Sequence, residues 1–208
     1  MLSLANKGLL VVLSGPSGVG KGTVCSFLKS INPGINFSIS ATTRKARAQE
    51  QNGVNYYFLS KDEFINKIYR NEFLEWAEVY GNFYGTPRAA VEEQLVQGKD
   101  VLLEIDIQGA CKVKESYPEG VFIFLLPPSK EELRKRILGR AADSPETIKK
   151  RLSCVDEELS AINNYHYVVV NDRVEQAADK ITAIIKAEKC RLSRNQDLLL
   201  NRRRSIID

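Results

Sequence analysis

A glycine-rich loop between an apolar segment and a helical one constrains this chain more than any other feature. The apolar run Leu9–Leu13 is followed by Gly-Pro-Ser-Gly-Val-Gly-Lys-Gly-Thr over residues 15–23. Glycines let backbone N–H groups converge on phosphate oxygens, the lysine adds a positive charge, and the start of the next helix adds its dipole. This order of strand, loop and helix predicts a phosphate-binding loop rather than an ordinary turn.

The rest of the chain repeats the alternation of strand and helix. Short apolar runs occur at Leu9–Leu13, Val101–Ile105, Val121–Leu126 and Tyr167–Val170, and helical patterns follow at about 21–30, 108–116, 130–138 and 174–189. Continuous apolar runs are typical of strands buried on both faces, and the βαβα order indicates a parallel sheet. We therefore expect a P-loop α/β fold, with a three-layer α/β/α core.

Two stretches interrupt this rhythm. Residues 38–86 hold short alternating segments rich in Tyr, Thr, Arg and Asn, which predict a mixed, mostly antiparallel sheet. Residues 139–144 lie between basic segments and predict a lid loop. The expected division is a core with the P-loop over 1–37, an inserted α+β subdomain over 38–87, core over 88–135, a small lid over 136–157, and core plus tail over 158–208.

Four pairs of residues indicate where helices begin. A serine precedes a glutamate by three positions at Ser60–Glu63 and at Ser129–Glu132, as in a capping box. Thr86-Pro87 and Ser144-Pro145 predict a capping hydroxyl followed by proline in the first turn.

Composition excludes several classes of protein. The longest unbroken apolar run of the 208 residues is Val121–Leu126, too short to span a bilayer. Residues 191–208 contribute five arginines and two aspartates to a net charge of +4, so the body lacks the basic stripe of a nucleic-acid-binding protein. We expect a cytoplasmic protein that acts on small molecules, without membrane or nucleic acid.

Histidine and cysteine offer little chemistry. The one histidine, His166, excludes multi-histidine metal sites and is expected to be structural. The four cysteines form no CxxC pair and are expected to be buried or half-buried thiols. The reaction therefore depends on Lys, Arg, Asp and Glu.

The inserted stretch carries a second set of groups suited to an anion. Arg44 and Arg47 precede Tyr56, and together they suit a phosphate clamp. Glu75 lies in an apolar segment, where a carboxylate needs hydrogen-bond donors. Guanine offers two adjacent donors, its N1–H and its amino group, whereas adenine offers an acceptor at N1.

These motifs together resemble the guanylate kinase family over nearly the whole chain. The resemblance is carried by Gly-Pro-Ser-Gly-Val-Gly-Lys, Ser-Ala-Thr-Thr-Arg with Arg47, Glu75-Trp76-Ala77, Tyr84-Gly85-Thr86 and the run Glu104–Gly109. It implies transfer of the γ-phosphoryl group of ATP to GMP, with dGMP left open as an acceptor, in a monomer or homodimer of purine nucleotide metabolism. The chain departs from the family pattern at Ala46, Gln49, Ala141 and Ala142.

The resemblance assigns roles by position. The residues expected to contact GMP are Ser40, Arg44, Arg47, Tyr56, Glu75, Tyr84, Thr86 and Asp106. Those expected to contact ATP are Gly15, Pro16, Ser17, Gly18, Val19, Gly20, Lys21, Gly22, Thr23 and Asn171. The expected catalytic cations are Lys21, Arg44, Arg136, Arg140 and Arg151; Arg136 and Arg140 would share a helix face if the helix continued through Gly139.

Magnesium is expected to accompany ATP. Gly22 stands where a P-loop commonly has the Ser or Thr that binds the ion, and Thr23 is turned by about 100° from it on the helix. Glu104 and Asp106 end an apolar strand, and alternation places them on one side of it. We therefore expect both carboxylates to hold the ion through water.

Two other functions are compatible with parts of the sequence. A kinase for another nucleoside monophosphate would share the P-loop, but Glu75 and Ser40 favour guanine. A guanylate-kinase-like scaffold module would bind peptides instead, but Gly20, Lys21 and the lid arginines favour an enzyme.

Overall fold

A computed structural model describes residues 7–79, 81–139 and 145–195. Its core is a five-stranded parallel sheet in the order β2-β7-β1-β8-β9. The strands are β1 (Leu10–Ser14), β2 (Ile35–Phe37), β7 (Asp100–Glu104), β8 (Val121–Leu126) and β9 (Tyr167–Val170). The predicted P-loop α/β fold is confirmed.

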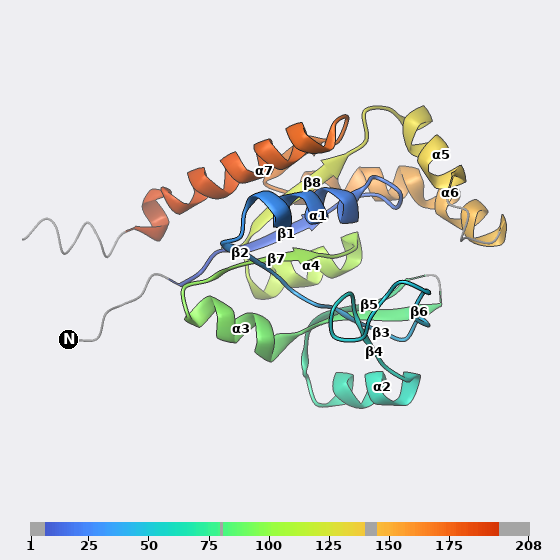
Figure 1. The fold of residues 1–208 in the computed structure, drawn as a ribbon, viewed down its shortest axis with the longest axis horizontal. Coiled ribbons are helices and arrows are strands. Elements are labelled where there is room, and N and C mark those ends of the chain that lie inside the picture. Colours follow the sequence, from blue (N-terminus) through green and yellow to red (C-terminus); the bar gives the residue numbers. More distant parts are fainter. Residues whose placement is uncertain (1–6, 80, 140–144, 196–208) are drawn as a thin grey trace, which may run out of the picture.

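Helices cover both faces of this sheet, as Figure 1 shows. One face carries α1 (Lys21–Ile31) and α7 (Val174–Lys189), and the other carries α3 (Arg88–Val96) and α4 (Ile107–Ser116). Beyond the carboxyl ends of the strands lie α5 (Lys130–Leu138) and α6 (Pro145–Ser160). Two short 3₁₀ helices, Ala161–Asn164 and Leu192–Arg194, complete the chain that is described.

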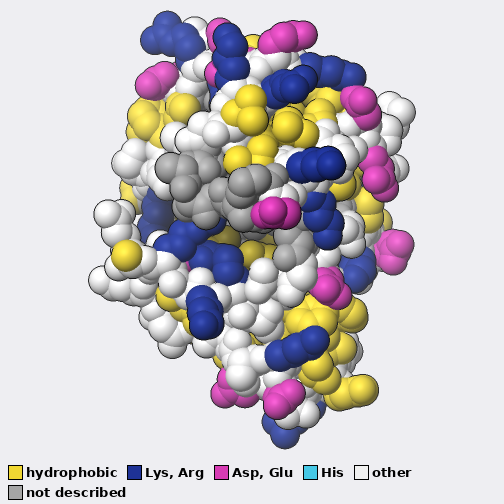
Figure 2. Space-filling view, turned by 90° about the vertical axis from the view of Figure 1, so that its right-hand side faces the viewer, with side chains coloured by type: hydrophobic (Ala, Val, Ile, Leu, Met, Phe, Trp, Pro, Cys, Tyr) yellow, Lys and Arg dark blue, Asp and Glu magenta, His cyan; other side chains and the backbone are white. Residues whose placement is uncertain are grey.

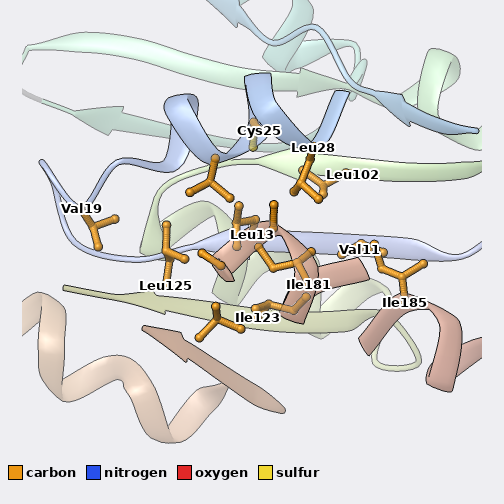
Figure 3. Close-up of a cluster of buried hydrophobic side chains, with 14 of the residues drawn as sticks. Val11, Leu13, Val19, Cys25, Leu28, Leu102, Ile123, Leu125, Ile181 and Ile185 are labelled. Carbon is orange, nitrogen blue, oxygen red and sulfur yellow. The ribbon is translucent and has the colours of Figure 1, made fainter. Parts of the chain in front are cut away.

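Alternation along β1 divides the core into two layers. Val11 and Leu13 pack with α1 and α7, as Figure 3 shows, whereas Leu10 and Val12 pack towards α3 and α4. All five residues of β1 are buried, which is why Leu10–Leu13 are apolar on both faces of the strand.

A second sheet, with the strand order β4-β3-β6-β5, lies beside the core. Its strands are β3 (Ala41–Thr42), β4 (Tyr57–Phe58), β5 (Phe73–Val79) and β6 (Asn82–Pro87), with α2 (Lys61–Tyr69) packed on it. Its β3–β4 pair is parallel and its other pairs are antiparallel, as predicted. Leu74 of β5 belongs to the apolar cluster of the core and joins the two sheets.

The helix-start predictions had mixed outcomes. Ser60 and Glu63 form the reciprocal capping box of α2, and Ser129 caps α5. The prediction for Thr86-Pro87 was wrong, because β6 continues to Pro87, α3 begins at Arg88, and no side chain caps it. Ser144 lies outside the described residues.

Other predictions also needed correction. The edge strand Ile35–Phe37 was missed, and Cys190 is exposed instead of buried or half-buried. His166 has a structural place: its Nδ1 accepts from Phe122 N at 3.5 Å, and its ring lies edge-on to Phe122. No helix in the described parts of the chain is both long and apolar enough to cross a membrane.

Candidate active site

A cleft of about 330 Å³ lies between the carboxyl ends of the core strands and the second sheet. Ligands bind at this edge in open α/β sheets. Figure 2 shows Lys and Arg side chains gathered near the middle of this side of the molecule. The predicted residues that line the cleft are Gly15, Ser17, Gly18, Lys21, Gly22, Ser40, Arg44, Arg47, Tyr56, Glu75, Tyr84, Glu104, Asp106 and Arg151.

The other predicted residues are elsewhere. Pro16, Val19, Gly20, Thr23, Thr86, Arg136 and Asn171 are not among the residues that line the cleft. Arg140 lies outside the described residues, as do Ala141 and Ala142.

The phosphate-binding loop follows β1 and opens α1. Gly18 and Gly20 have φ angles of 87° and 99°, which side chains other than glycine rarely adopt. The Lys21 ammonium donates to Gly15 O at 2.6 Å and to Pro16 O at 3.3 Å, so it bridges the loop over the cleft. The loop thus carries a positive charge and the amino end of α1 at one place.

Asn171 and Arg136 support this loop from behind. Asn171 is 3 % exposed, and its Nδ2 donates to Val19 O at 2.8 Å. Arg136 donates to Val19 O and to Asn171 O, each at 3.2 Å, and pairs with Glu132. Both side chains hold the P-loop in this structure. The condition under which Arg136 and Arg140 would share a helix face is not met, because α5 ends at Leu138 and Gly139 caps it.

Helix α6 meets the same loop through two side chains. Arg151 donates to the hydroxyl of Ser17, and Glu158 accepts from Ser17 N at 3.1 Å. Sequence reasoning missed Glu158, although its position seven residues after Arg151 places both on one face of a helix.

Arginines and tyrosines line the far end of the cleft. Arg44 forms a two-pronged ion pair with Glu50, at 3.0 Å and 2.9 Å, and lies 5.5 Å from the centre of the Tyr56 ring. The hydrogen bond from Arg44 lowers the pKa of Glu50, and burial raises the pKa of Tyr56 to about 12. Arg44 is therefore fixed in place, while Arg47 is exposed.

Glu75 lies deep in this end, on β5. It is 5 % exposed and its Oε1 accepts from Thr86 Oγ1 at 2.7 Å. Burial raises the pKa of Glu75 to about 7, and the hydrogen bond from Thr86 opposes that shift. The other oxygen faces Gly109 of α4, where an added Cβ would lie 2.5 Å from it. Thr86 and Gly109 thus fix the direction of this carboxylate.

Two more carboxyl groups lie at the floor of the cleft. Both Glu104 and Asp106 line it, but the prediction that one strand carries them is wrong: β7 ends at Glu104, and Asp106 caps α4 by accepting from Gly109 N at 3.0 Å. The side chain of Glu104 is open to the cleft, but the protein atoms around it remove part of its solvation and so raise its pKa, while the charge of Lys21 opposes this rise. An added Cβ at Gly22 would lie 3.4 Å from Glu104 Oε1, so this carboxylate stands over the start of α1.

Comparison with known proteins gives consistent results. The sequence model of the guanylate kinase family matches residues 7–188. A guanylate kinase of Caldanaerobacter subterraneus subsp. tengcongensis is 56% identical over 96% of this chain and 97% of its own length. One from Clostridium perfringens is 54% identical over 94% of this chain and 90% of its own.

Solved structures agree with this assignment. The crystal structure of guanylate kinase from Anaplasma phagocytophilum has a TM-score of 0.77 and 39% identity, and covers 91% of this chain and 90% of its own. Together with the P-loop, the buried Glu75 and the two arginines of the inserted sheet, these matches show that the chain belongs to the guanylate kinase family.

Proposed function

We propose that the cleft is where this chain carries out the reaction of its family, transfer of the γ-phosphoryl group of ATP to GMP. The observation that carries the assignment is that one cleft joins a P-loop with Lys21 to the buried acceptor Glu75. ATP would lie on Gly15–Thr23, with its phosphates towards Lys21 and Arg151. GMP would lie on the second sheet, with guanine at Glu75.

The acceptor end suits GMP in two separate ways. The buried Glu75 carboxylate faces a cleft where guanine N1–H and its amino group would be donors, and Ser40 and Asp106 line the same space. Arg44, Arg47, Tyr56 and Tyr84 supply cations and hydroxyls for the phosphate. Thr86 is 0 % exposed, and its hydroxyl donates a hydrogen bond to Glu75. We therefore propose that Thr86 positions the carboxylate rather than contacting guanine.

The chemistry needs alignment and cations more than a base. A GMP phosphate oxygen is already ionised at neutral pH and attacks the γ-phosphorus in line as the bond to the ADP oxygen breaks. Lys21 and Arg151 would stabilise charge on the transferring group, while Arg44 and Arg47 hold the acceptor. Arg136, Arg140 and Asn171 would contribute further to ATP binding.

The carboxylates at the floor of the cleft fit a magnesium ion bound through nucleotide and water. Magnesium prefers oxygen ligands and keeps several waters. Glu104 is open to the cleft beside Gly22, and Asp106 lies on the same floor, while no cluster of three acidic, His or Cys side chains occurs in the described parts of the chain. When bound, the ion would neutralise phosphate charge, and Glu104 and Asp106 would orient its waters.

Catalysis would require two parts of the chain to move. The inserted sheet over 38–87 and the lid over 136–157 would approach the core. The enzyme would act in the cytoplasm as a monomer or homodimer, and dGMP would serve as an alternative acceptor because the guanine contacts do not involve the ribose.

An assay of ADP release tests the proposal. Wild-type protein is expected to release ADP with GMP, but not with AMP, UMP or no acceptor, since a site built on hydrogen bonds rejects an analogue lacking them by about 10⁴-fold. Lys21→Ala should lower kcat at least ~10²-fold while the protein remains folded. Equal turnover of AMP, or normal turnover by folded Lys21→Ala, would contradict the assignment.

A further inference from the structure

Helix α6 contacts the phosphate-binding loop with two opposite charges. Arg151 and Glu158 are two helical turns apart, and both bond to Ser17, one through its hydroxyl and one through its backbone N–H. Both also line the cleft with Lys21. The arginine has a clear use beside a phosphate, whereas a carboxylate in that place needs another explanation.

The partner of Glu158 is a backbone N–H of the phosphate-binding loop. The backbone N–H groups of a P-loop are the donors that hold phosphate oxygens. Ser17 lies in that loop, and its backbone N–H donates a hydrogen bond to Glu158 Oε2, at 3.1 Å. Because a carboxylate and a phosphate are both anionic acceptors, one N–H cannot serve both well, and their charges repel at short range.

Charged neighbours surround this carboxylate. Partial burial raises the pKa of Glu158, and the hydrogen bond from Ser17 N and the charges of Lys21 and Arg151 oppose that rise. Two cations therefore face an internal anion in place of an external one. Arg44 is neutralised in a similar way by Glu50 at the other end of the cleft.

We propose that Glu158 occupies the phosphate-binding loop of the nucleotide-free enzyme and has to leave Ser17 before ATP binds there. The inference rests on the proposed placement of ATP at the P-loop. Helix α6 then exerts two opposing effects on the nucleotide, attraction through Arg151 and competition through Glu158. The competition weakens binding of ATP and ADP alike, and it assists release of ADP because the carboxylate can return to the amide.

Calorimetric titration of ATP and ADP tests this proposal in two matched variants. Glu158→Gln keeps the shape and an oxygen that can accept from Ser17 N, but it removes the charge. Glu157→Gln makes the same change in charge on the adjacent, exposed residue of α6. We expect Glu158→Gln to lower the Kd of ATP and of ADP by about tenfold, with the Kd of GMP unchanged and Glu157→Gln like wild type.

Two results would overturn the proposal. Equal Kd values for ATP in Glu158→Gln and Glu157→Gln would show no competition at Ser17. A higher Kd in Glu158→Gln would show that the carboxylate supports nucleotide binding by positioning Arg151. Absence of ATP binding by the wild-type protein would instead contradict the proposed function.

A second variant guards against misfolding. Glu158→Asp keeps the charge but shortens the side chain by one methylene, so the carboxylate can no longer reach Ser17 N from the same helix position. If Glu158→Gln fails to show a wild-type melting temperature, Glu158→Asp is expected to lower the Kd of ATP relative to Glu157→Gln, and an unchanged Kd would overturn the proposal.

Discussion

Glu75 shows how one side chain links specificity to pH. It is buried, Thr86 donates a hydrogen bond to it, and its pKa is raised to about 7. In the proposed complex guanine supplies further donors. The carboxylate must be ionised to accept them, so the pH at which it loses its proton becomes the pH at which GMP is recognised.

We expect kcat/KM for GMP to fall as the pH decreases through about 7, since this ratio reports the free enzyme. The second ionisation of a phosphate monoester, near ~6, contributes a separate step. The pH profile of Glu75→Gln should keep the step from the phosphate and lose only the step near pH 7. Its kcat/KM for GMP at pH 8 should be lower than that of wild type by ~10²-fold. The measurement is a pH profile of both proteins, and parallel profiles would contradict the role of Glu75.

Stability gives an independent check of the same group. A carboxyl whose pKa is raised on folding lowers the stability of the folded state once the pH exceeds the pKa of the unfolded chain, because the unfolded chain ionises first. That cost is absent below the unfolded pKa near 4.5, grows between 4.5 and about 7, and is complete above. Glu75→Gln should therefore have a free energy of unfolding higher than that of wild type by at most about 3 kcal/mol at pH 8, seen as a higher melting temperature. Near pH 4 the two proteins should melt at the same temperature.

Gly109 is predicted to control GMP recognition without contacting the nucleotide. A methyl group there would lie 2.5 Å from Glu75 Oε2, so Gly109→Ala should displace the carboxylate and raise KM for GMP about tenfold, with little change in KM for ATP. In a Glu75→Ala background the same substitution should stabilise the protein by up to ~1 kcal/mol, through the helix propensity of Ala. Kinetics and thermal unfolding of all four proteins complete the cycle, and an equal effect of Gly109→Ala in both backgrounds would rule out the contact.

The sequence identified some of these residues and missed others for a physical reason. Lys21, Arg44 and Glu75 are chemically unusual in their local context, and the sequence marks them. Gly109 and Glu158 act through contacts with β5 and with the P-loop, far away in the chain. Their environment is visible only after folding.

At the scale of elements, strands were predicted well where they form continuous apolar runs. The segments β8 and β9 were predicted to the residue, because Gly120 and Pro127 end one run and His166 and Asn171 end the other. The edge strand β2 has only three half-buried residues, so no pattern develops. Helix α3 begins one residue later than expected because Thr86 uses its hydroxyl for Glu75.

Asp106 serves an element and the cleft at once, and two variants separate these tasks. It caps α4 through Gly109 N and also lines the cleft. Asp106→Asn keeps a good cap and should leave the melting temperature nearly unchanged, whereas Asp106→Ala should lose about 1 kcal/mol. Both should lose most GMP activity, because both lack the charge. Thermal unfolding with steady-state kinetics tests this, and activity retained in Asp106→Asn would limit the residue to capping.

At the scale of the whole molecule, the two anion sites lie on separate sheets. Lys21 belongs to the core and Arg44 to the segment between β3 and β4 of the second sheet, yet both line one cleft. The sheets are joined where Leu74 of β5 packs into the core and β5 lies against α4. A pivot about that contact would bring the two phosphates together and exclude water.

Small-angle scattering is expected to show this closure. The radius of gyration should decrease when ATP analogue and GMP are both saturating, and less with either alone, because only the two ligands together connect the core with the second sheet. Arg44→Ala provides the control, since it should bind the donor but not close fully. An unchanged radius with both sites saturated would mean that the cleft is already formed for reaction.

The separation of the two sheets bears on how such enzymes diverge. The residues that would contact the acceptor base come mainly from one continuous stretch, between Phe37 at the end of β2 and Arg88 at the start of α3, whereas the donor loop belongs to the core. A new acceptor preference can therefore arise by changing that stretch, with the phosphoryl-handling machinery inherited intact. The contact between β5 and α4 limits such changes. Any residue that replaces Glu75 has to fit beside Gly109, which has no side chain, and beside Asp106, which caps α4. Those two core positions are therefore expected to change together with residues 38–87.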